Sequence, residues 1–476
     1  MSTPSAPLAP AASATSTPGL GALSCLALAM LLSSLGTSIA NVALPTFVRA
    51  FDASFQSVQW VVLAYLLAVT TVVVSAGRLG DLWGRRRLML AGIAVFTAAS
   101  LACAAATSLR MLVVARAGQG VGAAVMMALA MALVGEAVPK EGSGRAMGLL
   151  GTMSAAGTAL GPSLGGLLVG SIGWPAIFLL NAPLGLLAAV LAWRYLPREA
   201  GANARAGFDL PGSLLLAAAL GCYSLAMTLG HGHFGKSNLA LLCAAMACAL
   251  VFLVVESKSR SPLLRPALFR DRLVGAGFAG SALAATVAMT TLVVGPFYLS
   301  GALHLDATRI GLAMSAGPLV AALAGLPAGK AVDRFGAART TVAGLSLMAS
   351  GAWLLSRIAI DHGVAGYIVP LVTLTAGFAT FQAANNTAVV TGTDPRQRGV
   401  VSGLLNLSRN LGLVTGASLM GAVFMRAAGT SSIATARASA VVAGTHAAFL
   451  LATVLIAVAF VLSLGFAPRR TTPARS

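Results

Sequence analysis

The chain is a succession of apolar segments that are each long enough to cross a lipid bilayer. A membrane-spanning helix needs about 20 apolar residues. Fourteen segments of that length are predicted, at 20–48, 57–76, 88–107, 111–136, 147–169, 177–196, 210–229, 238–256, 273–299, 308–328, 340–358, 364–390, 400–424 and 445–466. The breaks between them contain Gly, Pro or charged residues. The pattern predicts an all-α membrane protein with fourteen transmembrane helices.

The composition excludes a soluble enzyme and a disordered protein. Of 476 residues, 58% are hydrophobic and only 9% are charged, whereas soluble proteins average about 25% charged residues. A net charge of +19 would indicate nucleic-acid binding in a soluble chain. Here the charges lie between apolar segments, so the expected partner is the lipid bilayer and no nucleic acid is expected. The location expected is the inner (plasma) membrane of the cell, with multiple spans.

The distribution of basic residues predicts the orientation. If the N-terminus is cytoplasmic and the loops alternate, 22 of the 31 Lys and Arg residues lie inside and seven lie outside. The other two, Arg116 and Arg409, lie within helices. Because cytoplasmic loops carry an excess of Lys and Arg, both termini are predicted to be cytoplasmic.

A loop motif occurs twice. Gly77-Arg78-Leu79-Gly80-Asp81-Leu82-Trp83-Gly84-Arg85 follows the second segment, and Gly329-Lys330-Ala331-Val332-Asp333-Arg334-Phe335-Gly336 follows the tenth, 252 residues later. Repeated halves with a substrate site between them are typical of transporters. The predicted layout is a disordered tail (1–19), a six-helix bundle (20–200), two linker helices (208–257), a second six-helix bundle (273–466) and a cytoplasmic tail (467–476).

Both copies of the motif contain a carboxylate and basic side chains at a cytoplasmic helix end. The carboxylates can cap helix N–H groups, and the basic groups can form charge-assisted bonds between the bundles. We expect a conformational latch; the alternative is a solvated loop with arginines that set the topology. Its residues are Gly77, Arg78, Gly80, Asp81, Gly84, Arg85, Gly329, Lys330, Asp333 and Gly336.

Polar side chains recur deep within the predicted helices. Ionisable groups at such depth are costly and usually functional, so Arg116 is a candidate for coupling together with Glu136. Gln382, Asn385 and Asn386 share one helix face by i, i+3 and i+4 spacing. Asn406, Arg409 and Asn410 share another face in the same way. The expected substrate cavity contains Asn41, Tyr65, Gln119, Tyr298, Gln382, Asn385, Asn386, Asn406, Arg409 and Asn410. The alternative for each amide or tyrosine is a contact between helices.

Several motifs, in order, resemble the major facilitator superfamily. The GRLGDLWGRRR loop resembles the family's motif between helices two and three, and Arg116-Ala117-Gly118-Gln119-Gly120 resembles its helix-four arginine motif. The fifth segment resembles the family's antiporter motif, and its small residues predict a helix-packing surface made by Gly157, Gly161, Pro162, Gly165 and Gly166. The resemblance extends to the fourteen-helix drug:proton antiporter branch, which usually has an Asp where this chain has Gly36.

The function expected is that of a secondary active transporter. The resemblance implies export of small amphipathic molecules (drugs or metabolites) by alternating access, with protons as counter-ion, by a monomer without cofactor or metal. Two alternatives stay open: a uniporter or importer of an organic anion or neutral metabolite without proton coupling, and a polytopic membrane enzyme. An enzyme is not expected, because the five His residues are scattered and form no metal-ligand pattern.

Overall fold

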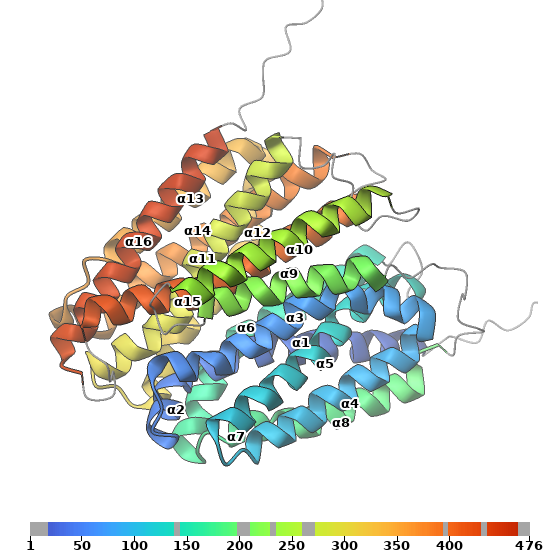
Figure 1. The fold of residues 1–476 in the computed structure, drawn as a ribbon, viewed down its shortest axis with the longest axis horizontal. Coiled ribbons are helices and arrows are strands. Elements are labelled where there is room, and N and C mark those ends of the chain that lie inside the picture. The colour runs from blue at the N-terminus through green and yellow to red at the C-terminus, as the bar shows by residue number, and fades with distance from the viewer. Residues whose placement is uncertain are drawn as a thin grey trace, which may run out of the picture.

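The computed structural model describes residues 18–137, 143–197, 210–228, 235–258, 272–393, 398–429 and 436–464, and within these ranges all regular structure is helical (Figure 1). The helices are α1 (Pro18–Val42), α2 (Leu44–Ala50), α3 (Phe55–Trp83), α4 (Arg85–Ala104), α5 (Leu109–Ala137), α6 (Ser143–Ser171), α7 (Ala176–Leu179), α8 (Asn181–Tyr195), α9 (Leu210–Thr228), α10 (Lys236–Lys258), α11 (Arg272–Gly301), α12 (Ala307–Phe335), α13 (Ala337–Leu355), the 3₁₀ turn η3 (Ile360–His362), α14 (Gly363–Thr391), α15 (Arg398–Ala428) and α16 (Ala438–Leu464).

All fourteen predicted segments coincide with helices. The first covers α1 and α2, the sixth covers α7 and α8, and each of the others matches one helix. Among the described residues, eleven helices are long and apolar enough to cross a membrane by length and composition. The Gly-rich α6, together with α9 and α13, is not among them. Fourteen crossings, cytoplasmic termini and the domain boundaries stay predictions, and the tails at 1–17 and 467–476 lie outside the described residues.

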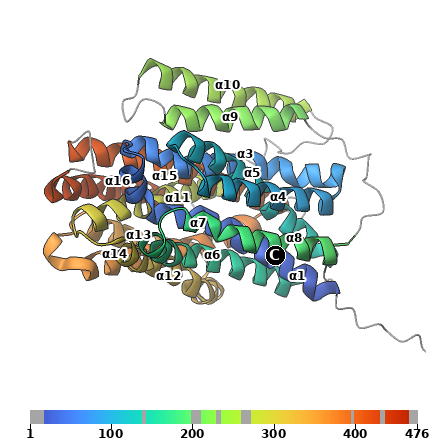
Figure 2. The ribbon, with the colours of Figure 1, turned by 90° about the horizontal axis from the view of Figure 1, so that it is seen from below.

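The helices pack as two groups with a separate pair on one face. Helices α1–α8 form the first group and α11–α16 form the second, in the cool and warm colours of Figure 1. Helices α9 and α10 pack against each other and form an outer layer in Figure 2. Helix α9 contacts both α3 and α15, so the pair covers a side of the boundary between the groups. The Tyr223 hydroxyl of α9 hydrogen-bonds Thr415 of α15.

The two groups are joined at the end that holds α2, the start of α3 and the start of α12, here called the sealed end. The Phe55 ring lies 4.6 Å from the Phe297 ring and 5.5 Å from the Phe424 ring, centroid to centroid. Gln59 Nε2 donates a hydrogen bond to the Ala417 carbonyl at 2.9 Å. These contacts bring α3 against α11 and α15.

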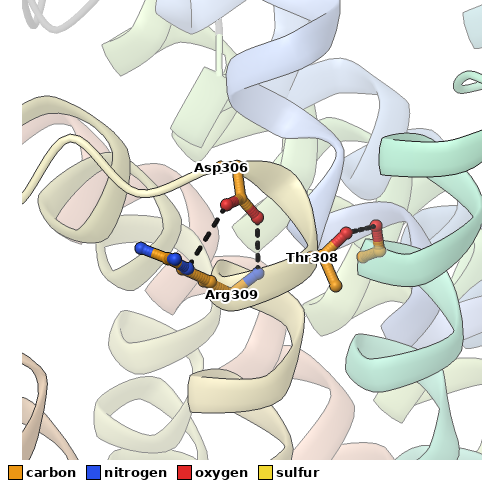
Figure 3. A network of polar contacts seen from close by, with 4 residues as sticks. Asp306, Thr308 and Arg309 are labelled. Carbon is orange, nitrogen blue, oxygen red and sulfur yellow. Dashed lines mark hydrogen bonds and ion pairs between the residues drawn. The ribbon is translucent and has the colours of Figure 1, made fainter.

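A second contact at the sealed end joins α6 to α12. Thr308 donates from Oγ1 to the Gly166 carbonyl at 3.4 Å (Figure 3). Beside it, Asp306 caps α12 by accepting from the Arg309 N–H at 2.9 Å. This cap fixes the start of α12 against α6, which belongs to the other group.

The glycines of α6 allow close packing on two sides. An added Cβ at Gly165 would lie 2.8 Å from the Ile39 carbonyl oxygen of α1, within the first group. An added Cβ at Gly166 would lie 2.7 Å from the Cα atom of Gly311 on α12. Consecutive residues point about 100° apart around a helix. The predicted packing surface therefore has one face toward its own group and one toward the other.

Candidate functional site

A cavity of about 400 Å³ lies between the two groups. It occupies the part of the molecule away from the sealed end, where α3, α5 and α14 end and α1, α6 and α15 begin; we call this the cavity end. Its walls come from four helices of the first group and two of the second. The volume is within the range of about 300–1,000 Å³ that is usual for sites of drug-sized ligands.

The second group supplies the polar wall of the cavity. Gln382 and Asn386 lie four residues apart on α14, and Asn406 and Arg409 lie three apart on α15, so each pair shares a helix face. Arg409 lies deeper in the helix than Asn406. It is roughly 16 Å along the axis from the start of α15, at 1.5 Å per residue. The amides offer donors and acceptors, and Arg409 is the only charged side chain among the described residues that line the cavity.

The first group supplies a wall that consists mainly of apolar side chains, including three methionines. Met30 comes from α1, whereas Met127 and Met131 share one face of α5. Ser154 of α6 also lines the cavity and hydrogen-bonds Ser34 at 2.6 Å between the two hydroxyl oxygens. The sequence did not single out these methionines, although the four-residue spacing of Met127 and Met131 was visible. Methionine adapts to ligands of different shape because its side chain is flexible and polarizable.

Arg116 lies outside the cavity and is fully buried within the first group. Its Nε donates to the Val61 carbonyl of α3 at 2.8 Å, and Nη2 donates to the Gly36 carbonyl of α1 at 3.0 Å. Nη1 donates to the amide oxygen of Gln119, one turn along α5. The guanidinium also lies 4.3 Å from the centre of the Tyr65 ring. Arg116 therefore joins three helices through carbonyl and amide oxygens and an aromatic face, without a carboxylate among these contacts.

Six residues predicted for the cavity lie elsewhere. Asn41 donates to carbonyls of its own helix, Tyr65 donates to the Ser33 carbonyl at 2.6 Å, and Gln119 donates to Ser100 at 2.7 Å. Tyr298 is buried and stacks on Tyr367, with 5.8 Å between ring centres. Asn385 and Asn410 are buried and do not line this cavity. Asn41, Tyr65 and Gln119 hydrogen-bond backbone or side-chain groups of the fold, as buried polar groups usually do.

The two copies of the latch motif lie at the cavity end, where each copy ends one helix and begins the next. Gly84 (φ 91°) separates α3 from α4, and Gly336 (φ 82°) separates α12 from α13. Residues with side chains are strained at such φ values, so glycine is required at both turns. Around them lie Gly77 and Gly80 of α3, Gly329, and the exposed Lys330 and Asp333 of α12.

The remaining latch and coupling residues are only partly described. Arg85 donates to the Ala132 carbonyl of α5 at 3.5 Å, which ties the first copy of the motif to its own group. The side chains of Arg78, Asp81 and Glu136 lie outside the description, although their backbones belong to α3 and α5. Both the latch and the role of Glu136 in coupling stay predictions.

The neighbours Asn385 and Asn386 are expected to differ in function. Asn385 is buried and donates from Nδ2 to the Gly277 carbonyl of α11 at 3.1 Å, whereas Asn386 is exposed to the cavity. Asn385→Ala should lower the free energy of unfolding by roughly 1 kcal/mol, the value of one such hydrogen bond. Asn386→Ala should leave stability unchanged and weaken ligand binding several-fold. Thermal unfolding and dye binding by the purified protein measure the two effects, and equal destabilisation by both variants would contradict the assignment.

Comparison with known proteins identifies the family. The family model of the Major Facilitator Superfamily matches residues 26–416 and, in a second match, 276–476. The riboflavin transporter RibZ of Clostridioides difficile is 30% identical over 402 residues, which cover 84% of this chain and 87% of RibZ. The multidrug resistance protein Stp of Mycobacterium tuberculosis is 32% identical over 401 residues, covering 83% of this chain and 74% of Stp.

A solved structure shows the same fold. A bacterial homologue of the human lysosomal transporter Spinster, in its inward-facing and unoccupied conformation, superposes with a TM-score of 0.71 at 16% identity, covering 97% of this chain and all of that chain. Transporters of this kind are not enzymes, so the expectation that the chain is not an enzyme is confirmed. The chain belongs to the major facilitator superfamily, and it is a multi-span transporter of the cell membrane that acts on small molecules.

Proposed function

We propose that this protein exports small amphipathic molecules from the cell by alternating access, in exchange for protons. The observation that carries the proposal is the cavity between the two groups, which combines a methionine wall with an amide and arginine wall. Such a cavity suits ligands that have both an apolar body and a polar group. The name of Stp, a multidrug resistance protein, supports export, and that of RibZ supports a polar organic substrate.

The orientation predicted from the basic residues determines which side of the membrane the cavity faces. If both termini are cytoplasmic, the cavity end faces the cytoplasm and the sealed end faces outward. This conformation would then take up substrate from the cytoplasm. Closure of the cavity end would bring the two copies of the latch motif together, while the contacts at the sealed end separate.

The proton site must lie outside the cavity wall that the structure describes. Among the described residues no carboxylate is buried, and Gly36 stands where the related branch usually has an Asp. We place the proton on Glu136 or Asp81, near the cavity end. His446, near the start of α16, is a third candidate, and its ring Nε2 donates to the Ile358 carbonyl at 2.7 Å. Because no described carboxylate lines the cavity, transport without proton coupling stays the second candidate function.

Everted membrane vesicles test the proposal. Vesicles that contain the protein, energised by respiration, should accumulate dyes such as fluorescein or rhodamine 6G several-fold more than vesicles without it. A protonophore should abolish the difference, and dye addition should shift the internal pH. The pH shift should be absent in vesicles that lack the protein. Accumulation that is independent of the protonophore would instead support a uniporter, and equal dye content with and without the protein would refute transport of these compounds.

A further inference from the structure

We propose that the ligand of the cavity is an organic anion, with its ionised group bound by Arg409 and its apolar body against the methionine wall. This inference rests on the proposed function and adds a substrate class to it. A carboxylate has two acceptor oxygens that a guanidinium binds in a bidentate manner. Lipophilic cations are correspondingly disfavoured.

The charge of Arg409 is not compensated by the described part of the protein. Its Nε is buried without a hydrogen-bond partner, and the described residues provide neither a hydrogen bond nor an ion pair to its guanidinium. The rest of the Arg409 side chain is half-buried at the wall of the cavity, so its outer N–H donors can reach a ligand. An anion in the cavity supplies the missing acceptor.

Arg409 contrasts with Arg116, the other arginine deep within the helices. The guanidinium of Arg116 donates to three oxygen atoms of the protein and lies over the Tyr65 ring. Its charge is thus solvated by the fold and it holds helices together. Arg409 has the same group at comparable depth but faces a cavity instead of acceptors. Arg116 is therefore a structural arginine, whereas Arg409 is available to bind a ligand.

The groups around Arg409 match the other parts of an amphipathic anion. Gln382 contributes an amide oxygen that is buried without a partner, and Asn386 and Asn406 line the same wall. Amides bind neutral polar groups of a ligand but do not compensate charge. On the opposite wall the methionines offer contact to a flat or aromatic body. The cavity therefore has a charged position, a hydrogen-bonding surround and an apolar face, which together match an amphipathic anion.

The test uses two dyes with one ring frame and opposite charge. Fluorescein, at a pH where it is ionised, and the cation rhodamine 6G share a xanthene frame, so the apolar contacts are matched. Binding to the purified protein in nanodiscs is measured by fluorescence anisotropy. The wild type should bind fluorescein at least about tenfold more tightly, because a cation would meet the like charge of Arg409.

Two variants connect the preference to Arg409. Arg409→Gln should weaken fluorescein binding about tenfold or more and leave rhodamine 6G binding unchanged or stronger. Asn406→Asp, which is nearly isosteric, places a carboxylate three residues from Arg409 on the same face and should also weaken fluorescein and strengthen rhodamine 6G. Arg426→Gln is the matched control, because Arg426 is exposed on the same helix α15 and does not line the cavity.

The outcomes separate this inference from the proposed function. If vesicles accumulate rhodamine 6G as well as fluorescein, and Arg409→Gln alters neither, transport stands and the anion preference is refuted. If Arg409→Gln fails to fold, Asn406→Asp decides: an unchanged ratio of the two affinities refutes the inference. If the wild type transports no dye yet binds fluorescein through Arg409, the anion site stands and the proposed export fails for these compounds.

Discussion

Replacing Gly311 by alanine should shift the transporter away from the conformation described here and reduce transport at least about fivefold. The added Cβ would lie 2.7 Å from the Cα atom of Gly166 and closer still to the Pro162 carbonyl. Both are backbone atoms, so α6 and α12 must separate. Overpacking of this kind typically costs about 1–3 kcal/mol, which corresponds to roughly 5- to 150-fold in an equilibrium constant. The cost falls on the conformation with a sealed end, because this contact joins the two groups.

Spin labels at Ile172 and Leu312 measure the shift. Both side chains are exposed and flank the α6–α12 contact, and the labels are introduced after the five native cysteines are replaced. The distance between labels should lengthen in Gly311→Ala. Gly325→Ala on the same helix is the control, because an added Cβ there has no atom within 4 Å. An unchanged distance together with full transport by Gly311→Ala would show that the sealed end does not depend on this contact.

Gly161→Ala should behave differently, although Gly161 belongs to the α6 packing surface that Gly311 contacts. An added Cβ at Gly161 would meet Ser38 and lie 3.0 Å from the Ile39 nitrogen of α1. That contact is internal to the first group and persists if the groups move as rigid bodies. Gly161→Ala should therefore lower the melting temperature without lengthening the distance between the labels at Ile172 and Leu312.

The helices could be predicted from the sequence because the bilayer imposes their length. A run of about 20 apolar residues bounded by Gly, Pro or charge has few alternatives to a helix. Helical spacing predicted the polar faces of α14 and α15. Spacings of i, i+3 and i+4 place Gln382 with Asn386, and Asn406 with Arg409, on common faces.

The rotation of each helix about its axis could not be predicted. Asn385 and Asn386 are neighbours about 100° apart around α14, and only packing decides that Asn385 bonds α11 while Asn386 lines the cavity. The sequence does not predict that Met30, Met127 and Met131 face the cavity, because an apolar side chain in an apolar helix is compatible with any orientation. The contacts of Arg116 with carbonyls of α1 and α3 were likewise hidden, since backbone acceptors leave no trace in the sequence.

Arg116→Lys should destabilise the protein and reduce transport strongly, although it conserves the charge. Lysine has a single ammonium group on a flexible stem, so it cannot reproduce the planar fork that reaches α1, α3 and Gln119 together. A hydrogen bond from a charged donor contributes about 1.5–3 kcal/mol. Loss of one or two of the three bonds should therefore lower the free energy of unfolding by roughly 3 kcal/mol, which thermal unfolding in detergent measures. Arg110→Lys is the control, because Arg110 is exposed on the same helix α5.

The combination of stability and binding data distinguishes a structural role from ligand binding. Because Arg116 does not line the cavity, Arg116→Lys in its folded fraction should bind fluorescein with nearly wild-type affinity, whereas Arg409→Gln should lose fluorescein binding and keep its melting temperature. The opposite pattern, with affinity lost and stability kept in Arg116→Lys, would place Arg116 in the ligand site and contradict the geometry of its three hydrogen bonds. The binding readout is taken at a temperature where both variants are folded.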